Sequence, residues 1–356
     1  MRTLLFHIVL FSLVSCAAAQ EMEQVVDLTG RWRFEIGDDT TWASKNFDDS
    51  DWDRIAVPDY WENQGYPGYD GWAWYRQSFR INESYRYASL FLHMGGIDDI
   101  DEVYVNGKLL SFSGSPPPQY FTAYAEDRWY YLPYEYLSYH DENVVAVRVF
   151  DREMGGGIIR GRIGIYRQLS YLVPDQSLRG NWKLRLGDRR EWSKPDYSDD
   201  DWHDVFVPAY WETQRDRHYD GFGWYRRHFR LDPALANQRL ILLLGRIDDV
   251  DEVWLNGKQI GRTGKMPEQR GTFFDNSSYL KLRSYYIPKT LLRANEDNVI
   301  AVRIYDGFMH GGMYQGPIGL VRQKRYREWD AKSTRHEKGG FQRLIESIFG
   351  KSEQNR

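Results

Sequence analysis

The sequence predicts an all-β protein built from two tandem jelly-roll β-sandwich domains. The stretch 95–108, GGIDDIDEVYVNGK, recurs at 245–258 as GRIDDVDEVWLNGK, which indicates a duplicated unit. Apolar side chains fall at every second position in Val145, Val147 and Val149, as in a strand with one buried face. Helical periodicity is weak in both units, and Gly and Pro turns are frequent, which favours a sandwich or jelly roll.

The two units run from 27 to 167 and from 177 to 322, and a short segment around 172–175 joins them. The strand-like stretch 143–151 recurs at 298–306. Each unit is long enough to bury a core of its own. We therefore expect two domains of the same fold.

Two local patterns place strands within the units. Residues 103–105 lead into Asn106-Gly107, a two-residue turn whose positive φ angles suit Asn and Gly. The run 240–244 is apolar throughout, so we expect this strand to be covered on both faces.

The basic tail, 323–356, differs in character from the two domains. Its apolar residues have the spacing of one face of a short amphipathic helix: Phe341, Leu344, Ile345, Ile348 and Phe349. Two interpretations stay open. The helix packs back on the second domain, or it docks to a partner or to membrane headgroups.

Residues 1–19 are typical of an export signal, because the apolar run 4–14 is too short to span a bilayer. The segment 13–16, LVSC, is similar to a bacterial lipobox, in which Cys16 would be lipidated; cleavage before Gln20 is the alternative. Cys16 is the one cysteine in the sequence, so we expect no disulfide and no thiolate metal site. We predict a lipoprotein of the outer membrane or cell surface, or otherwise a periplasmic or secreted protein.

Composition narrows the class of partner. The formal net charge is −4, which argues against a nucleic-acid partner. Aromatic residues make up 16% of the chain, with 14 Trp and 26 Tyr. Such richness suits a packed sandwich and equally a surface that stacks on sugar rings.

Each unit presents the same motifs in the same order. In the first unit they are DDSDW at 48–52, VPDYW at 57–61, WYR at 74–76, DEVYVNG at 101–107 and NVVAVRV at 143–149. This order resembles the sugar-binding jelly roll of family 2 glycoside hydrolases, a galactose-binding-like domain that also accompanies some sialate O-acetylesterases.

The resemblance implies a carbohydrate-binding function linked to polysaccharide metabolism. In that family the jelly roll accompanies a separate catalytic domain, whereas here a second jelly roll begins where that domain would start. We therefore predict no catalytic residues and a non-catalytic protein that binds a polysaccharide or oligosaccharide. Envelope enzymes are the further partners we expect, and membrane contact is expected only through the lipid anchor. Two alternatives stay open: a structural or assembly protein of the cell envelope, and a glycoside hydrolase or carbohydrate esterase acting at the inter-domain cleft.

The acidic residues of the repeated motif admit three interpretations. Glycosidic catalysis needs two carboxylates flanking one bond. A Ca²⁺ site needs six to eight oxygens, and the spacing does not match an EF-hand loop. Acids at a strand start can instead accept backbone N–H bonds or pair with Arg. We predict this structural role, with no metal and no other cofactor, for Asp98, Asp99, Asp101 and Glu102 and for Asp248, Asp249, Asp251 and Glu252.

Two loops in each unit carry aromatic and short polar residues, and such loops on a rigid sandwich commonly bind ligands. One loop precedes the Trp-Tyr-Arg motif, and the other follows the last shared strand. By the family resemblance, both border the sugar site; a purely structural ordering of the loops is the alternative. We predict ligand binding by Trp61, Tyr69, Asp70, Trp72, Asp151 and Glu153, and by their counterparts Trp211, Tyr219, Asp220, Phe222 and Asp306.

Overall fold

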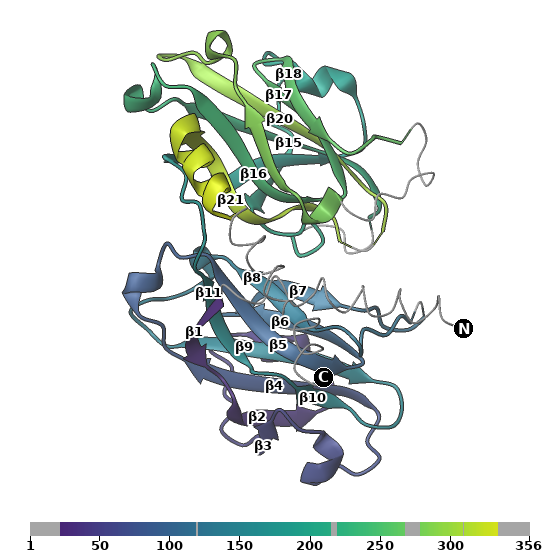
Figure 1. The fold of residues 1–356 in the computed structure, drawn as a ribbon. Coiled ribbons are helices and arrows are strands. Elements are labelled where there is room, and N and C mark those ends of the chain that lie inside the picture. The colour runs from purple at the N-terminus through teal and green to yellow at the C-terminus, as the bar shows by residue number, and fades with distance from the viewer. Residues whose placement is uncertain (1–21, 119, 215–218, 268–277, 309, 334–356) are drawn as a thin grey trace, which may run out of the picture.

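The structure is a computed structural model that describes residues 22–118, 120–214, 219–267, 278–308 and 310–333. Figure 1 shows two β-sandwiches stacked one on the other. The predicted signal segment, Cys16 and the predicted helix at 341–349 lie outside the described residues. No helix within the described ranges is long and apolar enough to cross a membrane.

The first domain, residues 22–168, pairs a six-stranded sheet with a five-stranded sheet. The order of the six-stranded sheet is β3 (Asp53–Val57), β2 (Gly30–Ile36), β4 (Gly71–Phe79), β9 (Asn143–Asp151), β6 (Ile100–Val105) and β7 (Lys108–Ser113). The other sheet has the order β1 (Met22–Asp27), β11 (Gly164–Gln168), β5 (Leu90–Asp98) and β10 (Gly157–Arg160), with β8 (Arg128–Leu132) also paired to β5.

The second domain, residues 176–322, follows the same plan. Its six-stranded sheet has the order β14 (His203–Val207), β13 (Gly180–Leu186), β15 (Gly221–Arg230), β20 (Asp297–Asp306), β17 (Val250–Leu255) and β18 (Lys258–Thr263). Its four-stranded sheet has the order β12 (Gln176–Ser177), β21 (Gly312–Arg322), β16 (Leu240–Asp248) and β19 (Leu282–Tyr286). The predicted all-β sandwich fold is confirmed.

Each core lies between the two sheets of its domain. Val145, Val147 and Val149 are fully buried in the first core, because alternate residues of β9 face the same side of the sheet. The predicted Asn-Gly turn joins β6 to β7, with Asn106 at φ 52° and Gly107 at φ 81°.

β16 is covered on both faces, as its apolar sequence predicts. Leu242 and its alternate neighbours on the strand face the core, whereas Ile241 and Leu243 face outward. A helix over residues 323–333 packs on that outer face through Tyr326 and Trp329. The start of the tail therefore packs on the second domain.

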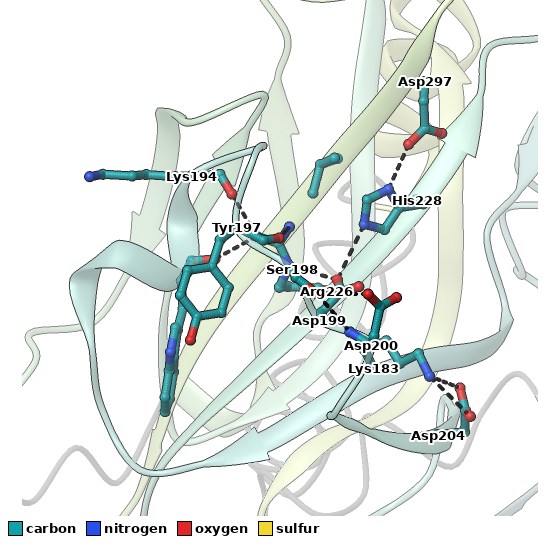
Figure 2. A network of polar contacts seen from close by, with 12 residues as sticks. Lys183, Lys194, Tyr197, Ser198, Asp199, Asp200, Asp204, Arg226, His228 and Asp297 are labelled. Atoms are coloured by element: carbon teal, nitrogen blue, oxygen red, sulfur yellow. Dashed lines mark hydrogen bonds and ion pairs between the residues drawn. The ribbon is translucent and has the colours of Figure 1, made fainter.

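One buried arginine in each domain fixes the loop that carries the DD-x-x-W motif. Figure 2 shows Arg226, whose Nε donates to Asp199 Oδ2 at 2.7 Å. Its Nη1 and Nη2 donate to the carbonyls of Lys194 and Tyr197, both at 2.9 Å. Arg76 binds Asp49 and the matching loop carbonyls in the first domain. These bonds explain why the Trp-Tyr-Arg and DD-x-x-W motifs occur together.

Candidate functional site

Two loops of the first domain, 59–70 and 151–157, meet at one end of the sandwich; we call this region the first loop end. The backbone N–H of Trp61 donates to Gly156 O at 3.2 Å. The N–H of Gly156 in turn lies 3.2 Å from both carboxylate oxygens of Glu62. The two loops that were predicted to border one site are thus bonded to each other.

Trp61 and Trp211 are core residues, with 0% and 1% of their surface exposed. The Trp61 indole N–H donates to Tyr69 O at 3.1 Å. Its ring covers Gly156 so closely that a Cβ there would lie 2.1 Å from it, and Gly311 meets Trp211 in the same way. The prediction that these two rings bind ligand is corrected, because neither offers an exposed face.

Asp151 and Asp306, at the ends of β9 and β20, are also fully buried. Each points inward beside the Asp-Asp pair of its own domain. Neither carboxylate reaches the surface, so the prediction that Asp151 and Asp306 contact a surface ligand is corrected for the same reason.

Tyr69 and Tyr219 hold their loops in shape. The Tyr69 hydroxyl donates to Trp72 O at 2.6 Å and accepts from Gly37 N at 3.2 Å. The Tyr219 hydroxyl donates to Phe222 O at 2.9 Å. Their rings are half-buried, so their predicted contact with a ligand stays a prediction.

Trp72 lies on the outer face of the six-stranded sheet, because it is one residue out of phase with the inward-facing Ala73. The Arg148 guanidinium sits over its ring at 3.6 Å, and the Phe150 ring is 5.0 Å away. Phe222 has the same position in the second domain, beneath Arg303 at 4.4 Å. Trp72 is therefore not on the same side of the sheet as Trp61.

Asp70 and Glu153 are exposed at the first loop end, and Asp220 is half-buried at the equivalent place. Tyr60, which sequence reasoning missed, is 39% exposed there, with its ring against Gly155. Tyr60 is in an extended conformation (φ −69°, ψ 140°). Neighbouring side chains of an extended segment point in opposite directions, so a buried Trp61 implies an outward Tyr60.

The loop end of the second domain is covered by the first domain. Tyr210, the counterpart of Tyr60, stacks on Tyr314 with a centroid distance of 4.9 Å and an interplanar angle of 4°. His310 lies between Tyr210, at 4.7 Å, and Phe112 of the first domain, at 4.3 Å. Glu212, the counterpart of Glu62, is 1% exposed.

The second half of the acidic motif forms buried ion pairs, as its structural interpretation predicts. Asp101 Oδ1 accepts from Arg128 Nε at 2.9 Å, and Asp251 Oδ1 accepts from Arg283 Nε at 2.8 Å. All four of these side chains are fully buried. Glu102 and Glu252 pair with arginines of β9 and β20 at 3.2 and 3.0 Å.

Burial and the repulsion between neighbouring carboxylates raise the pKa values of the acidic residues at the two loop ends to different extents. Burial, then the neighbouring Asp99, raises the pKa of Asp98 to about 6. Burial and the same Asp-Asp pair raise the pKa of Asp151 to about 7. In the second domain the corresponding pKa values are higher, about 10 for Asp248 and about 8 for Asp306, mainly because burial is deeper. The first loop end thus keeps the more ionisable carboxyl groups.

Comparison with known proteins finds one family, several curated relatives and several solved structures that are similar to this chain. Residues 186–306 match the family described as Beta-galactosidase second all-beta domain. The chain is 27% identical over 157 residues to Beta-galactosidase BoGH2A of Bacteroides ovatus, covering 40% of this chain and 17% of that protein. It is 28% identical over 169 residues to a putative beta-glucuronidase of Formosa agariphila, covering 44% of this chain and 15% of that protein. The structure of Bacteroides uniformis beta-glucuronidase is similar with a TM-score of 0.34 and 14% identity, over 84% of this chain and 31% of that one.

The fold and these matches define a β-sandwich protein whose second domain is similar to an all-β domain of beta-galactosidases. The family match over residues 186–306 and the named relatives confirm the resemblance to glycoside hydrolase family 2 seen in the motifs. The alignments cover less than a fifth of each curated relative.

Proposed function

We propose that the protein is an exported, non-catalytic carbohydrate-binding protein whose first domain carries the sugar site at its loop end. The observation that carries the proposal is the Tyr60 ring, 39% exposed at the loop end of a domain that repeats the motifs of the matched second domain. A sugar ring stacks its C–H face on an aromatic ring and offers its hydroxyls to polar groups. Asp70 and Glu153 are exposed on the two loops that meet at this end, and they supply such groups.

The names of the relatives suggest the ligand class. Two are named beta-galactosidase and beta-glucuronidase, so glycans that end in β-galactosyl or β-glucuronyl units are the first candidates. The proposal includes the lipid anchor at Cys16 and a polysaccharide of the envelope or its surroundings as partner. Envelope enzymes would then act on the bound polymer.

A binding assay with the mature protein tests this proposal. We expect Tyr60→Ala to weaken binding to the best oligosaccharide at least about tenfold, or about 1.4 kcal/mol. Tyr286→Ala is the matched control, because Tyr286 is an exposed tyrosine of the second domain, 53% accessible. Unchanged affinity in Tyr60→Ala, with both variants folded by circular dichroism, would contradict the placement of the site.

The hydrolase alternative has a direct assay. Release of 4-nitrophenol from the β-galactoside or β-glucuronide by the purified chain would replace the binding proposal with an enzymatic one. We expect no release above that of a heat-denatured sample.

A structural role is favoured for one part of the molecule, the second loop end. His310, Tyr210 and Tyr314 fill the contact with the first domain. This region fixes the two domains together, and it has no exposed counterpart of the Tyr60 ring.

A further inference from the structure

Three carboxylates of the first domain converge below the proposed sugar site. Asp98 is the last residue of β5, and Asp99 lies between β5 and β6. Asp151 is the last residue of β9, which pairs with β6. One oxygen of each carboxylate lies within 4.8 Å of the others. Chain segments that are distant in sequence therefore aim three acids at one point.

Within the described part of the chain, the buried Asp151 carboxylate lacks a hydrogen-bond donor or a counter-ion. Its side chain is fully buried, and neither of its oxygens accepts a hydrogen bond of normal geometry; the Glu153 amide lies near enough only to lower its pKa. Asp98 faces Asp99 directly, a contact in which two ionised carboxylates repel each other. A buried polar group without a partner is unfavourable, so the three carboxylates require a proton or a cation that neutralises their charge.

The neighbouring arginine side chains bind other groups and not the carboxylates of this cluster. The Arg128 guanidinium donates to Asp101 Oδ1 at 2.9 Å, to Glu126 O at 2.8 Å and to the backbone O of Asp99 at 3.2 Å. The Arg152 guanidinium sits over the Tyr120 ring. Among the described residues, no Lys or Arg side chain forms an ion pair with a carboxylate of the cluster, and the neighbouring Arg128 and Arg148 pair with Asp101 and Glu102.

Asp99 is oriented for a ligand role by bonds that leave it ionised. Its Oδ1 accepts from the Thr122 hydroxyl at 2.6 Å, and its Oδ2 accepts from the Arg152 backbone N–H at 3.1 Å. The Tyr120 side chain also hydrogen-bonds this carboxylate and lowers its pKa, so the Asp99 oxygens are held in place on several sides.

We propose that Asp98, Asp99 and Asp151 bind one Ca²⁺ ion. The donors are hard carboxylate oxygens, which Ca²⁺ prefers. Oxygens bound at about 2.3–2.6 Å to one ion can be up to about 5 Å apart, which agrees with the spacing here. Asp98 is partly exposed, so water can complete the six to eight ligands that the ion requires.

The second domain provides an internal control. Asp248, Asp249 and Asp306 repeat the geometry. There Asp306 Oδ1 accepts from the Phe308 N–H at 3.2 Å, so Asp306 is not left wholly without a partner among the described residues, as Asp151 is. The proposal concerns the first domain alone.

Calorimetric titration of the full mature chain, stripped with EDTA, tests the proposal. Extracellular calcium sites bind in a range of about 10⁻⁴–10⁻³ M, so titration to about 10 mM CaCl₂ covers it. We expect one equivalent to be lost in Asp151→Asn and retained in Asp306→Asn. At about ten times Kd, Ca²⁺ should raise the Tm of the wild type by roughly 3–6 °C, and this rise should vanish in Asp151→Asn.

The isosteric Asn keeps the fold testable, because it removes charge without opening a cavity. Near-UV circular dichroism of Asp151→Asn without Ca²⁺ should equal that of the wild type. Two results would overturn the proposal: no saturable Ca²⁺ binding to the folded wild type, which leaves a shared proton only, or full stoichiometry in Asp151→Asn.

Discussion

The two loop ends share their motifs and backbone but differ in what covers them. Tyr60 is exposed to solvent, whereas Tyr210 is packed on Tyr314 and His310. Glu62 is half-buried, whereas burial raises the pKa of Glu212 to about 9. Part of the difference lies in the repeats themselves, because His310 and Tyr314 stand where the first domain has Gly155 and Ile159, and part lies in the first domain, which lines the space beside Tyr210. A site of this kind is defined by its surroundings as much as by its own residues.

The largest expected effect tests the shared framework. Trp61→Ala and Trp211→Ala should each lower the free energy of unfolding by about 3–5 kcal/mol, because both remove a fully buried indole. Urea denaturation followed by circular dichroism measures the loss. Trp129→Ala is the control, since Trp129 is 38% exposed and should matter less. If Trp61→Ala kept the stability of the wild type and lost only sugar binding, the original prediction that the Trp61 ring stacks on a sugar would be supported instead.

A smaller effect tests the covered loop end. Burial lowers the pKa of His310 to about 4, well below its ordinary value of 6.5. The neutral ring is therefore favoured in the folded state, and its contribution is complete above pH 6.5 and is lost as the pH falls toward 4. We expect a loss on the order of 2 kcal/mol at pH 4, with loosening of the domain contact visible by small-angle scattering.

His310→Phe is the matching variant, because a phenyl ring fits between Phe112 and Tyr210 without a titrating group. It should keep the domains in contact at pH 4. Equal acid sensitivity in the variant would show that other groups control the contact.

The smallest effect has the opposite sign. His228 lies between Asp199, at 3.2 Å, and Asp297, at 2.6 Å, as Figure 2 shows. These carboxylates raise the pKa of His228, so its contribution is complete below pH 6.5 and is lost as the pH rises through the raised value. The side chain is 43% exposed, so we expect no more than about 0.5 kcal/mol.

His228→Ser introduces the residue that the first domain has at this position, Ser78, and should remove this pH dependence from thermal unfolding. Ser78→His is the reciprocal variant, because Asp49 and Glu142 occupy the places of the two aspartates. It should add a similar dependence to the first domain. A flat profile in that variant would show that the two environments differ.

Most of the fold follows from local sequence patterns. The Asn-Gly turn, the alternation in β9 and the doubly covered β16 each depend on neighbours in the chain or on one buried face. The acidic motif was also predictable in part, because Asp101 and Asp251 required a buried cation and each found an arginine.

The sites were less predictable, for two physical reasons. An aromatic in a Gly-rich loop can face inward or outward, and the sequence alone did not show that Gly156 makes room for Trp61. The contact between domains is also invisible to a comparison of the two repeats. Tyr60 and Tyr210 are the same residue type at matching positions, yet Tyr210 lines the space between the domains, whereas Tyr60 is 39% exposed.

The outer face of β16 sets a practical limit on dissecting the molecule. The helix over 323–333 covers Ile241 and Leu243, and the Trp329 indole N–H donates to Ser170 O at 2.7 Å in the connection between the domains. The second sandwich therefore contacts two segments outside its own strands: the connection before it and the helix after it. A fragment cut at 176 and 322 would carry a bare apolar stripe, so an autonomous half of this protein must include its flanks.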